Sequence, residues 1–138
     1  MPKLERTILN PSTVANPLGA YSHSVIVSPG KLLFIAGQVA VDQNGNPVGK
    51  GDVKAQTRQV FQNLAAVLSG AGASFSNVVE FTTYLVGRGS VQPFVEARTE
   101  IFPTIFPDSD YPPNTLLIIS GLVREEFLVE IKAVAALP

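Results

Sequence analysis

The chain has 138 residues, a formal net charge of −1 and 15% charged residues, whereas 46% of its residues are hydrophobic. This length suits one domain with a buried core, so we expect a single domain over residues 1–138. The near-neutral charge argues against nucleic acid or an anionic membrane as a partner. The absence of cysteine excludes disulfides and thiol catalysis, and the single histidine excludes a multi-histidine metal centre.

The first third of the chain predicts three strands separated by loops. Lys3–Leu9 is a weak strand candidate, and the proline- and glycine-interrupted stretch 10–20 is predicted as a loop. Ser22–Val27 and Lys31–Ile35 are strand-like runs on either side of Pro29-Gly30, which is the signal of a type II turn. We therefore expect these two runs to form a β-hairpin. The second run is continuously apolar, which indicates a strand covered on both faces.

The middle of the chain predicts a helix, a strand and a second helix. Apolar residues recur at spacings of three and four over Val53–Ala71, with Asp52 placed as N-cap and Gly72 as C-terminal cap. Val78–Val86 is rich in β-branched and aromatic residues and predicts a strand. Ser90 can cap a second helix, which Pro103 should kink or end.

Two apolar runs close the chain, at Thr115–Leu122 and Phe127–Val134, and both have strand length. With the preceding elements they predict an α+β fold, in which two helices pack on one face of a mixed sheet. The strands are too apolar for their other face to meet water, so we expect self-association to cover it. The opening residues show no apolar signal core and no run approaches a membrane span, which favours a cytoplasmic protein.

Candidate chemistry lies on strands and strand ends. Glu130, inside the last apolar run, could hold a water or act as general base in a subunit cleft. The alternative is a solvated position beside Lys132 or an ion pair at a subunit interface. Tyr21 could line an apolar pocket, and His23 could serve in acid–base chemistry or in structure alone. Ala36-Gly37-Gln38 could present backbone groups to a ligand or form a simple turn. Nucleophile-elbow, phosphate-loop and dinucleotide patterns are absent.

Several segments together resemble the Rid family (RidA/YjgF, also described as endoribonuclease L-PSP). They are GAYSHSV at 19–25, LFIAGQVAVD at 33–42, KAQTRQVFQNLAAVLSGAGASFSNVVEFTTYL at 54–85, TEIF at 99–102 and LVEIKAVA at 128–135. The resemblance covers nearly the whole chain in the right order. It implies a chorismate-mutase-like subunit, assembled as a homotrimer with a ligand cleft at each subunit interface.

The resemblance also implies roles for particular residues. Archetypal members hydrolyse 2-imino and 2-enamino acids to 2-keto acids and ammonia without a cofactor. A glutamate in their last strand positions the attacking water, and Glu130 falls on it. Tyr21 falls on the cleft tyrosine and Gly37 on a strand-end glycine, whereas His23 and Ala36 replace a glutamine and a serine.

Two positions depart further from the archetype. Asn114, after Pro112-Pro113, stands where an arginine holds the substrate carboxylate, and an amide cannot supply the guanidinium fork. A helical asparagine is also missing, and Thr99 stands there in one alignment and Val95 in another. The chain therefore resembles branches of the family that lack the arginine. Arg88 and Arg124 are the candidates to replace it from a neighbouring subunit.

Three functions are compatible with these observations. The first is a cofactor-free, trimeric hydrolase of imines or enamines that lack an essential carboxylate, with Glu130 as catalytic residue. The substrate-binding candidates are Tyr21, His23, Ala36, Gly37, Gln38, Thr99 and Asn114. The second is a trimer of the same fold that binds a small metabolite without turnover. The third, which the family's other description suggests, is an endoribonuclease or translation inhibitor. The net charge and the single histidine argue against it.

Overall fold

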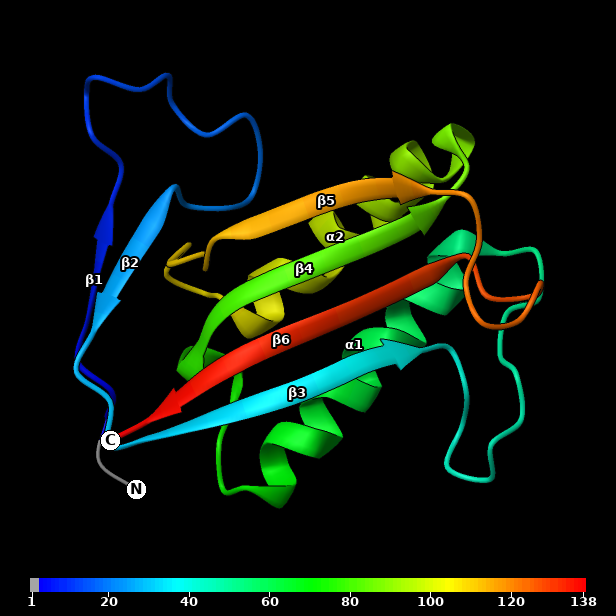
Figure 1. Cartoon of the computed structure of the whole chain (residues 1–138), viewed down its shortest axis with the longest axis horizontal. Helices are drawn as coiled ribbons and strands as arrows, with labels where there is room; N and C mark the ends of the chain where they lie inside the picture. Colours follow the sequence, from blue (N-terminus) through cyan, green and yellow to red (C-terminus); the bar gives the residue numbers. More distant parts are fainter. Residues whose placement is uncertain (1–2) are drawn as a thin grey trace.

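The computed structural model describes residues 3–138 and folds them into two β-sheets and two α-helices. β1 and β2 form an antiparallel ribbon, and the other strands form a sheet in the order β3-β6-β4-β5 (Figure 1). The larger sheet is mixed, because β6 is antiparallel to both neighbours and β4 is parallel to β5. The strands are β1 (Arg6–Leu9), β2 (Ser24–Val27), β3 (Lys31–Val39), β4 (Val78–Val86), β5 (Asn114–Ile119) and β6 (Val129–Leu137). The helices are α1 (Val53–Gly70) and α2 (Val91–Ile105), with short 3-10 turns η1 (Phe75–Asn77) and η2 (Arg88–Ser90).

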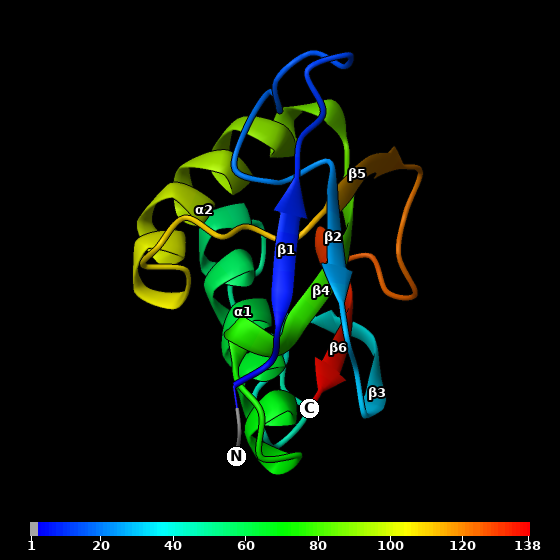
Figure 2. The same ribbon diagram turned by 90° about the vertical axis from the view of Figure 1, so that its left-hand side faces the viewer.

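The elements form two layers. Both helices lie against one face of the four-stranded sheet, and within residues 3–138 no helix covers the other face (Figure 2). The predicted α+β class, with two helices on one face of a mixed sheet, is confirmed at this level. Neither helix of the described part of the chain is long and apolar enough to cross a membrane.

Aromatic side chains fill the space between the helices and the sheet. Phe61 of α1 and Phe102 of α2 meet edge to face with ring centroids 5.7 Å apart, and both lie close to Phe81 of β4. Phe106, just after α2, packs edge to face on Phe102 at 5.0 Å. These contacts join both helices to the central strands, so the helix-facing side of the sheet is apolar and closely packed.

The first helix begins and ends as its sequence predicts. The side chain of Asp52 accepts a hydrogen bond from the backbone N–H of Ala55 at 3.0 Å, which satisfies an N-terminal donor of α1. Gly72 follows the helix with a φ of +71°, and its N–H donates to the carbonyl of Ser69. Only glycine adopts this left-handed conformation without strain, so the cap stops the helix where the period ends.

The second helix differs from prediction at its start, and it continues past its proline. Ser90 occupies the N-cap position, but its hydroxyl donates to the carbonyl of Val86 and does not cap an N–H of α2. Pro103 does not end the helix, which continues to Ile105. A proline this close to the end removes only one helical hydrogen bond, the one that the Thr99 carbonyl would accept, so the last turn still forms.

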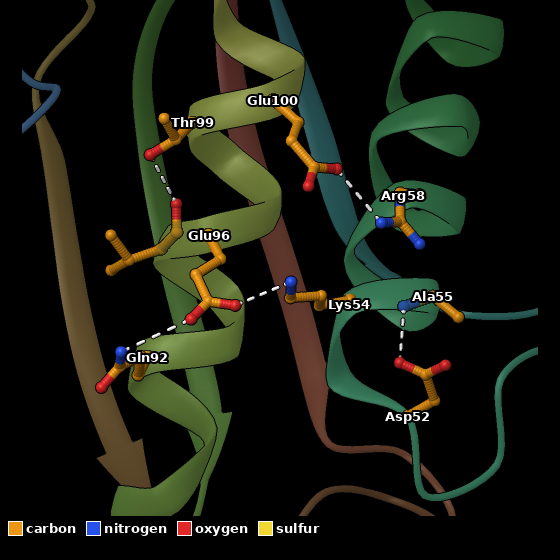
Figure 3. Close-up of polar contacts among 9 residues, drawn as sticks. Asp52, Lys54, Ala55, Arg58, Gln92, Glu96, Thr99 and Glu100 are labelled. Carbon is orange, nitrogen blue, oxygen red and sulfur yellow. Dashed lines mark hydrogen bonds and ion pairs between the residues drawn. The ribbon is translucent and has the colours of Figure 1, made fainter.

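Ion pairs connect the outer surfaces of the two helices. Lys54 of α1 pairs with Glu96 of α2 at 2.7 Å, and Arg58 pairs with Glu100 at 3.1 Å (Figure 3). The hydrogen bond from Lys54 lowers the pKa of the Glu96 carboxyl and raises the pKa of the Lys54 ammonium. Because these groups are exposed to water, the pairs align the helices more than they stabilise the fold.

The predicted hairpin between Ser22–Val27 and Lys31–Ile35 is wrong. β2 pairs with β1 in the separate ribbon, whereas β3 pairs with β6 at the edge of the large sheet. Gly30 marks the point where the chain passes from one sheet to the other. Its N–H donates to the Leu137 carbonyl, and a Cβ there would lie 2.7 Å from the Pro138 carbonyl oxygen. The glycine is therefore required by the close approach of the C-terminal strand, not by a hairpin turn.

The helix-free face of the sheet exposes large apolar side chains. On β3, Phe34 is 74% exposed and Leu32 is 52% exposed, and Leu117 on β5 is also exposed. The apolar run of β3 is thus covered on only one face within the described chain. Exposed apolar surface on this scale is typical of an interaction face.

Candidate functional site

Glu130 lies on the helix-free face of the sheet, near the start of β6. Its register partners are Val39 on β3 and Tyr84 on β4. The carboxylate packs directly on Gly37, where a Cβ would lie 2.4 Å from Oε2 of Glu130. Among residues 3–138 no hydrogen bond or ion pair engages this carboxylate, and the side chain is half-buried. It is therefore free to accept a proton or hold a water.

The glycine belongs to an irregularity in β3. The pairing of β3 with β6 shifts between Ile35 and Gln38, so Ala36 and Gly37 form a bulge. Bulges re-aim side chains and backbone groups, and they are common next to active sites. Here the side-chain amide of Gln38 donates to the carbonyl of Ala36 at 3.1 Å, which braces the bulge under the Glu130 carboxylate.

Tyr84 is a residue that the sequence analysis missed. It is half-buried and directly opposite Glu130 on the same face of the sheet. The alternation of side chains along β4 assigns Tyr84 to one face of that strand. Only the structure shows that β4 pairs with β6 and that Tyr84 lies opposite Glu130.

Asn114 lies on the other face of the sheet, toward the helices. It pairs in register with Phe81, whose ring is in the core between sheet and helices. Its side-chain oxygen accepts a hydrogen bond from the hydroxyl of Thr83 at 2.9 Å. No hydrogen bond within residues 3–138 engages the N–H₂ of this amide, so it remains available as a donor.

The segment before β2 closes over Asn114. Buried Ser22 donates from its hydroxyl to the carbonyl of Tyr111, and its N–H donates to the carbonyl of Pro112 at 3.4 Å. Next to it, the Tyr21 hydroxyl accepts a hydrogen bond from the N–H of Leu18 at 3.1 Å. These bonds hold Tyr21 beside the start of β5. A hollow of about 260 Å³ opens there, lined by Leu18, Gly19, Tyr21, Arg98, Asn114 and Leu116.

Two predicted site residues serve local structure. His23 contacts the carbonyl of Ala15 through Nε2, and its ring meets Tyr21 edge to face at 6.1 Å. It braces the loop that carries Tyr21 and does not line the hollow. Thr99 is exposed on α2, where its hydroxyl donates to the carbonyl of Val95 at 2.8 Å (Figure 3).

Arg98 of α2 is the cation of this region, and the sequence analysis did not select it. Its guanidinium lies over the rings of Phe94 and Phe102, with the central carbon 5.4 and 5.8 Å from the two centroids. Burial lowers the pKa of Arg98, and Tyr111 opposes this in part. By contrast, Arg88 is exposed in η2, and Arg124 pairs with Glu126. The position of Arg98 on the apolar stripe of α2 was the signal that could have found it.

The predicted site residues therefore form two groups on opposite faces of the sheet. One contains Gly37 and Glu130, and the other contains Tyr21 and Asn114 with Arg98. Asn114 pairs with Phe81 and Glu130 with Tyr84 on the intervening strand β4, so two inter-strand spacings and three residues along the strand separate them. At about 4.8 Å per strand and 3.3 Å per residue, their Cα atoms are roughly 14 Å apart. A small ligand cannot contact both groups of one protomer across the sheet.

Other features of the chain offer less chemistry. No group of three or more His, Cys, Asp or Glu side chains within residues 3–138 is arranged to hold a metal ion. A larger hollow of about 760 Å³ lies between the β1–β2 ribbon and the end of α2. None of the predicted site residues lines it.

Comparison with known proteins identifies the family and the structural relatives of this chain. Residues 12–137 match the family described as endoribonuclease L-PSP. A RutC family protein of Pyrococcus horikoshii is 34% identical over 119 residues, which are 86% of this chain and 88% of that protein. The crystal structure of YyfB, a conserved Rid-family protein from Yersinia pestis, superposes with a TM-score of 0.86 at 36% identity, over 96% of this chain and 98% of that one. Escherichia coli TdcF with bound serine shares the fold, with a TM-score of 0.70 at 22% identity over 96% and 99% of the two chains.

The fold and these matches define the class of this protein: it is a small α+β protein with a mixed sheet and two helices on one face. The chain belongs to the Rid/YjgF family, as the sequence segments predict.

Proposed function

We propose that this protein is a cofactor-free hydrolase of imines or enamines, releasing ammonia and a carbonyl product. The observation that carries the proposal is the Glu130 carboxylate, which has no partner among residues 3–138 and rests on a glycine that leaves it room. In this role Glu130 orients a water and accepts its proton as the oxygen attacks the imine carbon. Glu130 returns this proton to the nitrogen of the resulting carbinolamine, and the hydroxyl proton follows. The C–N bond then breaks as the C=O bond forms, and the nitrogen leaves as ammonia.

The proposed site is a cleft between subunits of a homotrimer with a chorismate-mutase-like arrangement. Two observations support this assembly. The helix-free face exposes Phe34 and Leu32, which a neighbouring subunit would cover. The separation of Glu130 from Asn114 requires two protomers if both groups contact one ligand. TdcF, which has the same fold, was crystallised with bound serine, a ligand of the size that such a cleft would hold.

The test is release of ammonia from 2-iminopropionate or 2-iminobutyrate generated in situ. Wild-type protein should accelerate release, and Glu130→Gln should reduce it toward the uncatalysed rate, a loss of about 10²–10⁴-fold for a missing general base. Glu80→Gln is the matched control, because Glu80 is an exposed carboxylate on β4, a strand of the same sheet. It should leave the rate unchanged.

The oligomeric state of each variant decides how a loss of rate is interpreted. Size-exclusion chromatography with light scattering should give the same molar mass for Glu130→Gln and for wild type. Dissociation would make Glu130 a structural residue, and full activity in the variant would remove it from the mechanism.

A second candidate function is binding of a small metabolite without turnover. It is favoured by Asn114, because the strand position that holds a guanidinium in archetypal family members carries a neutral amide here. In that case wild-type protein would release no ammonia, and Glu130→Gln would change ligand affinity only. An endoribonuclease activity has weaker support, because the charge is −1 and His23 is engaged in the loop.

A further inference from the structure

Arg98 is a guanidinium without an acidic partner on the wall of the hollow beside Asn114. The ion pairs formed within residues 3–138 are Lys54–Glu96, Arg58–Glu100 and Arg124–Glu126, and none of them includes Arg98. No carboxylate lines the hollow. Instead, the guanidinium lies over two phenylalanine rings. The ring faces attract the cation, but they are not charged acceptors for its N–H groups.

The surroundings of the guanidinium form a small binding site. The chain passes close to it at Gly19, where a Cβ would lie 3.4 Å from Nη2 of Arg98. Asn114 contributes the N–H₂ of its amide, because the Thr83 hydroxyl already occupies its oxygen. Tyr21 and Leu116 add a wall that is largely apolar. A planar donor fork and an amide donor in one hollow form a site for an anion.

We infer that Arg98 and Asn114 together bind the carboxylate of a short-chain ligand in this hollow. The hollow of about 260 Å³ has room for a small acid. For the reaction itself, the inference rests on the proposed function. It narrows the substrate class of the proposed hydrolase to imines that carry a carboxylate. The strand position carries the neutral amide of Asn114, and helix α2 supplies a guanidinium to the same hollow. Neither Arg88 nor Arg124 is needed for this role.

The test is binding of pyruvate, followed by calorimetry or by NMR shifts, with pyruvamide as a neutral probe of the same size. Wild-type protein should bind pyruvate, more weakly as salt is added, and should bind pyruvamide at least tenfold less tightly. Arg98→Met keeps the length and the contact with the rings but removes the charge. It should weaken pyruvate binding about ten- to hundredfold, as expected for a charge-assisted pair. Arg88→Gln, which removes an exposed arginine of η2, should bind as wild type does.

A second variant keeps the inference testable if Arg98→Met fails to fold. Asn114→Asp preserves size and the acceptor for the Thr83 hydroxyl, but it places a carboxylate beside the guanidinium. It should lose pyruvate binding and unfold at a higher temperature than wild type. Unchanged pyruvate affinity in either variant would overturn the inference.

The assay of ammonia release separates this inference from the proposed function. Pyruvate binding that depends on Arg98, in a protein that releases no ammonia, would keep the inference and remove the hydrolase. Ammonia release that depends on Glu130 but not on Arg98 would keep the hydrolase and overturn the inference.

Discussion

At the scale of single residues, Gly37 positions the proposed catalytic carboxylate by having no side chain. A Cβ at this position would lie 2.4 Å from Oε2, 2.6 Å from Cδ and 2.8 Å from Cγ of Glu130. Gly37→Ala should therefore displace the carboxylate and leave the fold intact, because the end of a glutamate side chain can move. A displacement of about 1 Å can reduce turnover about 10²-fold.

The measurement compares ammonia release with thermal unfolding. Gly37→Ala should lose most of its activity while its unfolding free energy changes by about 1 kcal/mol, at the low end for overpacking. Gly121→Ala is the matched control, because a Cβ there meets nothing within 4 Å. Wild-type turnover in Gly37→Ala would show that the position of the carboxylate over the bulge does not matter.

At the scale of elements, a buried glutamine connects α1 to the approach to β6. Gln56 is 1% exposed, and its side-chain N–H₂ donates to the carbonyls of Gly49 and Glu126 at 3.1 and 2.8 Å. Its side-chain oxygen accepts from the N–H of Leu128 at 2.8 Å. These bonds satisfy backbone groups that α1 and the loop would otherwise bury without partners. They also fix the chain just before the strand that carries Glu130.

Gln56→Leu should destabilise the protein by about 2–4 kcal/mol, because it leaves several backbone groups buried and unpaired. Gln62→Leu makes the same change at an exposed position of α1 and should stay within about 0.5 kcal/mol of wild type. Urea unfolding at one fixed protein concentration measures both. Equal stability of Gln56→Leu and wild type would show that water replaces the lost bonds.

Elements that depend on local sequence were predictable, and those that depend on distant contacts were not. The period of α1, with Asp52 before it and Gly72 after it, specifies the helix within a few residues of its own chain. The pairing of β3 with β6 brings together residues about one hundred positions apart, so Pro29-Gly30 could not reveal it. A turn signal shows that the chain changes direction, but not which strands then pair.

The candidate site was likewise predictable where it depends on local sequence and unpredictable where it depends on distant contacts. Glu130 is conspicuous as a carboxylate in an apolar strand, and the family segments select Gly37 and Tyr21. The role of Arg98 depends on how α2 packs on the sheet and on where the loop at Gly19 passes. An arginine in an apolar helical stripe is usually expected to extend to solvent. The apolar stripe of α2 therefore marks Arg98 as unusual, but only the structure shows that it lies beside Asn114.

At the scale of the whole molecule, the proposed site is split between the two faces of a sheet. Asn114 and Arg98 belong to the helix side, and Glu130 belongs to the helix-free side. In a ring of identical subunits, each interface joins one surface of a subunit to a different surface of its neighbour. Such an interface can place the anion-binding group of one protomer against the carboxylate of the next. Each complete site would then need Arg98 from one chain and Glu130 from another.

This arrangement predicts that two inactive variants restore each other. Glu130→Gln and Arg98→Met should each be inactive as pure oligomers in the ammonia assay. When they are co-expressed and assembled at random, about a quarter of the interfaces would combine an intact Glu130 with an intact Arg98. Ammonia release by the unfractionated mixture should therefore recover to about a quarter of the wild-type rate.

Two differently tagged copies allow the mixed oligomers to be purified through both tags before the assay. In a trimeric ring, one of the three interfaces of every mixed oligomer joins the two intact groups, so the purified oligomers should reach about a third of the wild-type rate. Mixing the variants only after each has assembled alone is the control, and it should show no recovery until subunits exchange. If both groups acted within one protomer, every chain in the mixture would carry one defect, and no mixed oligomer could recover. Purified mixed oligomers without activity would therefore place the whole site in a single chain, despite the roughly 14 Å between its two groups.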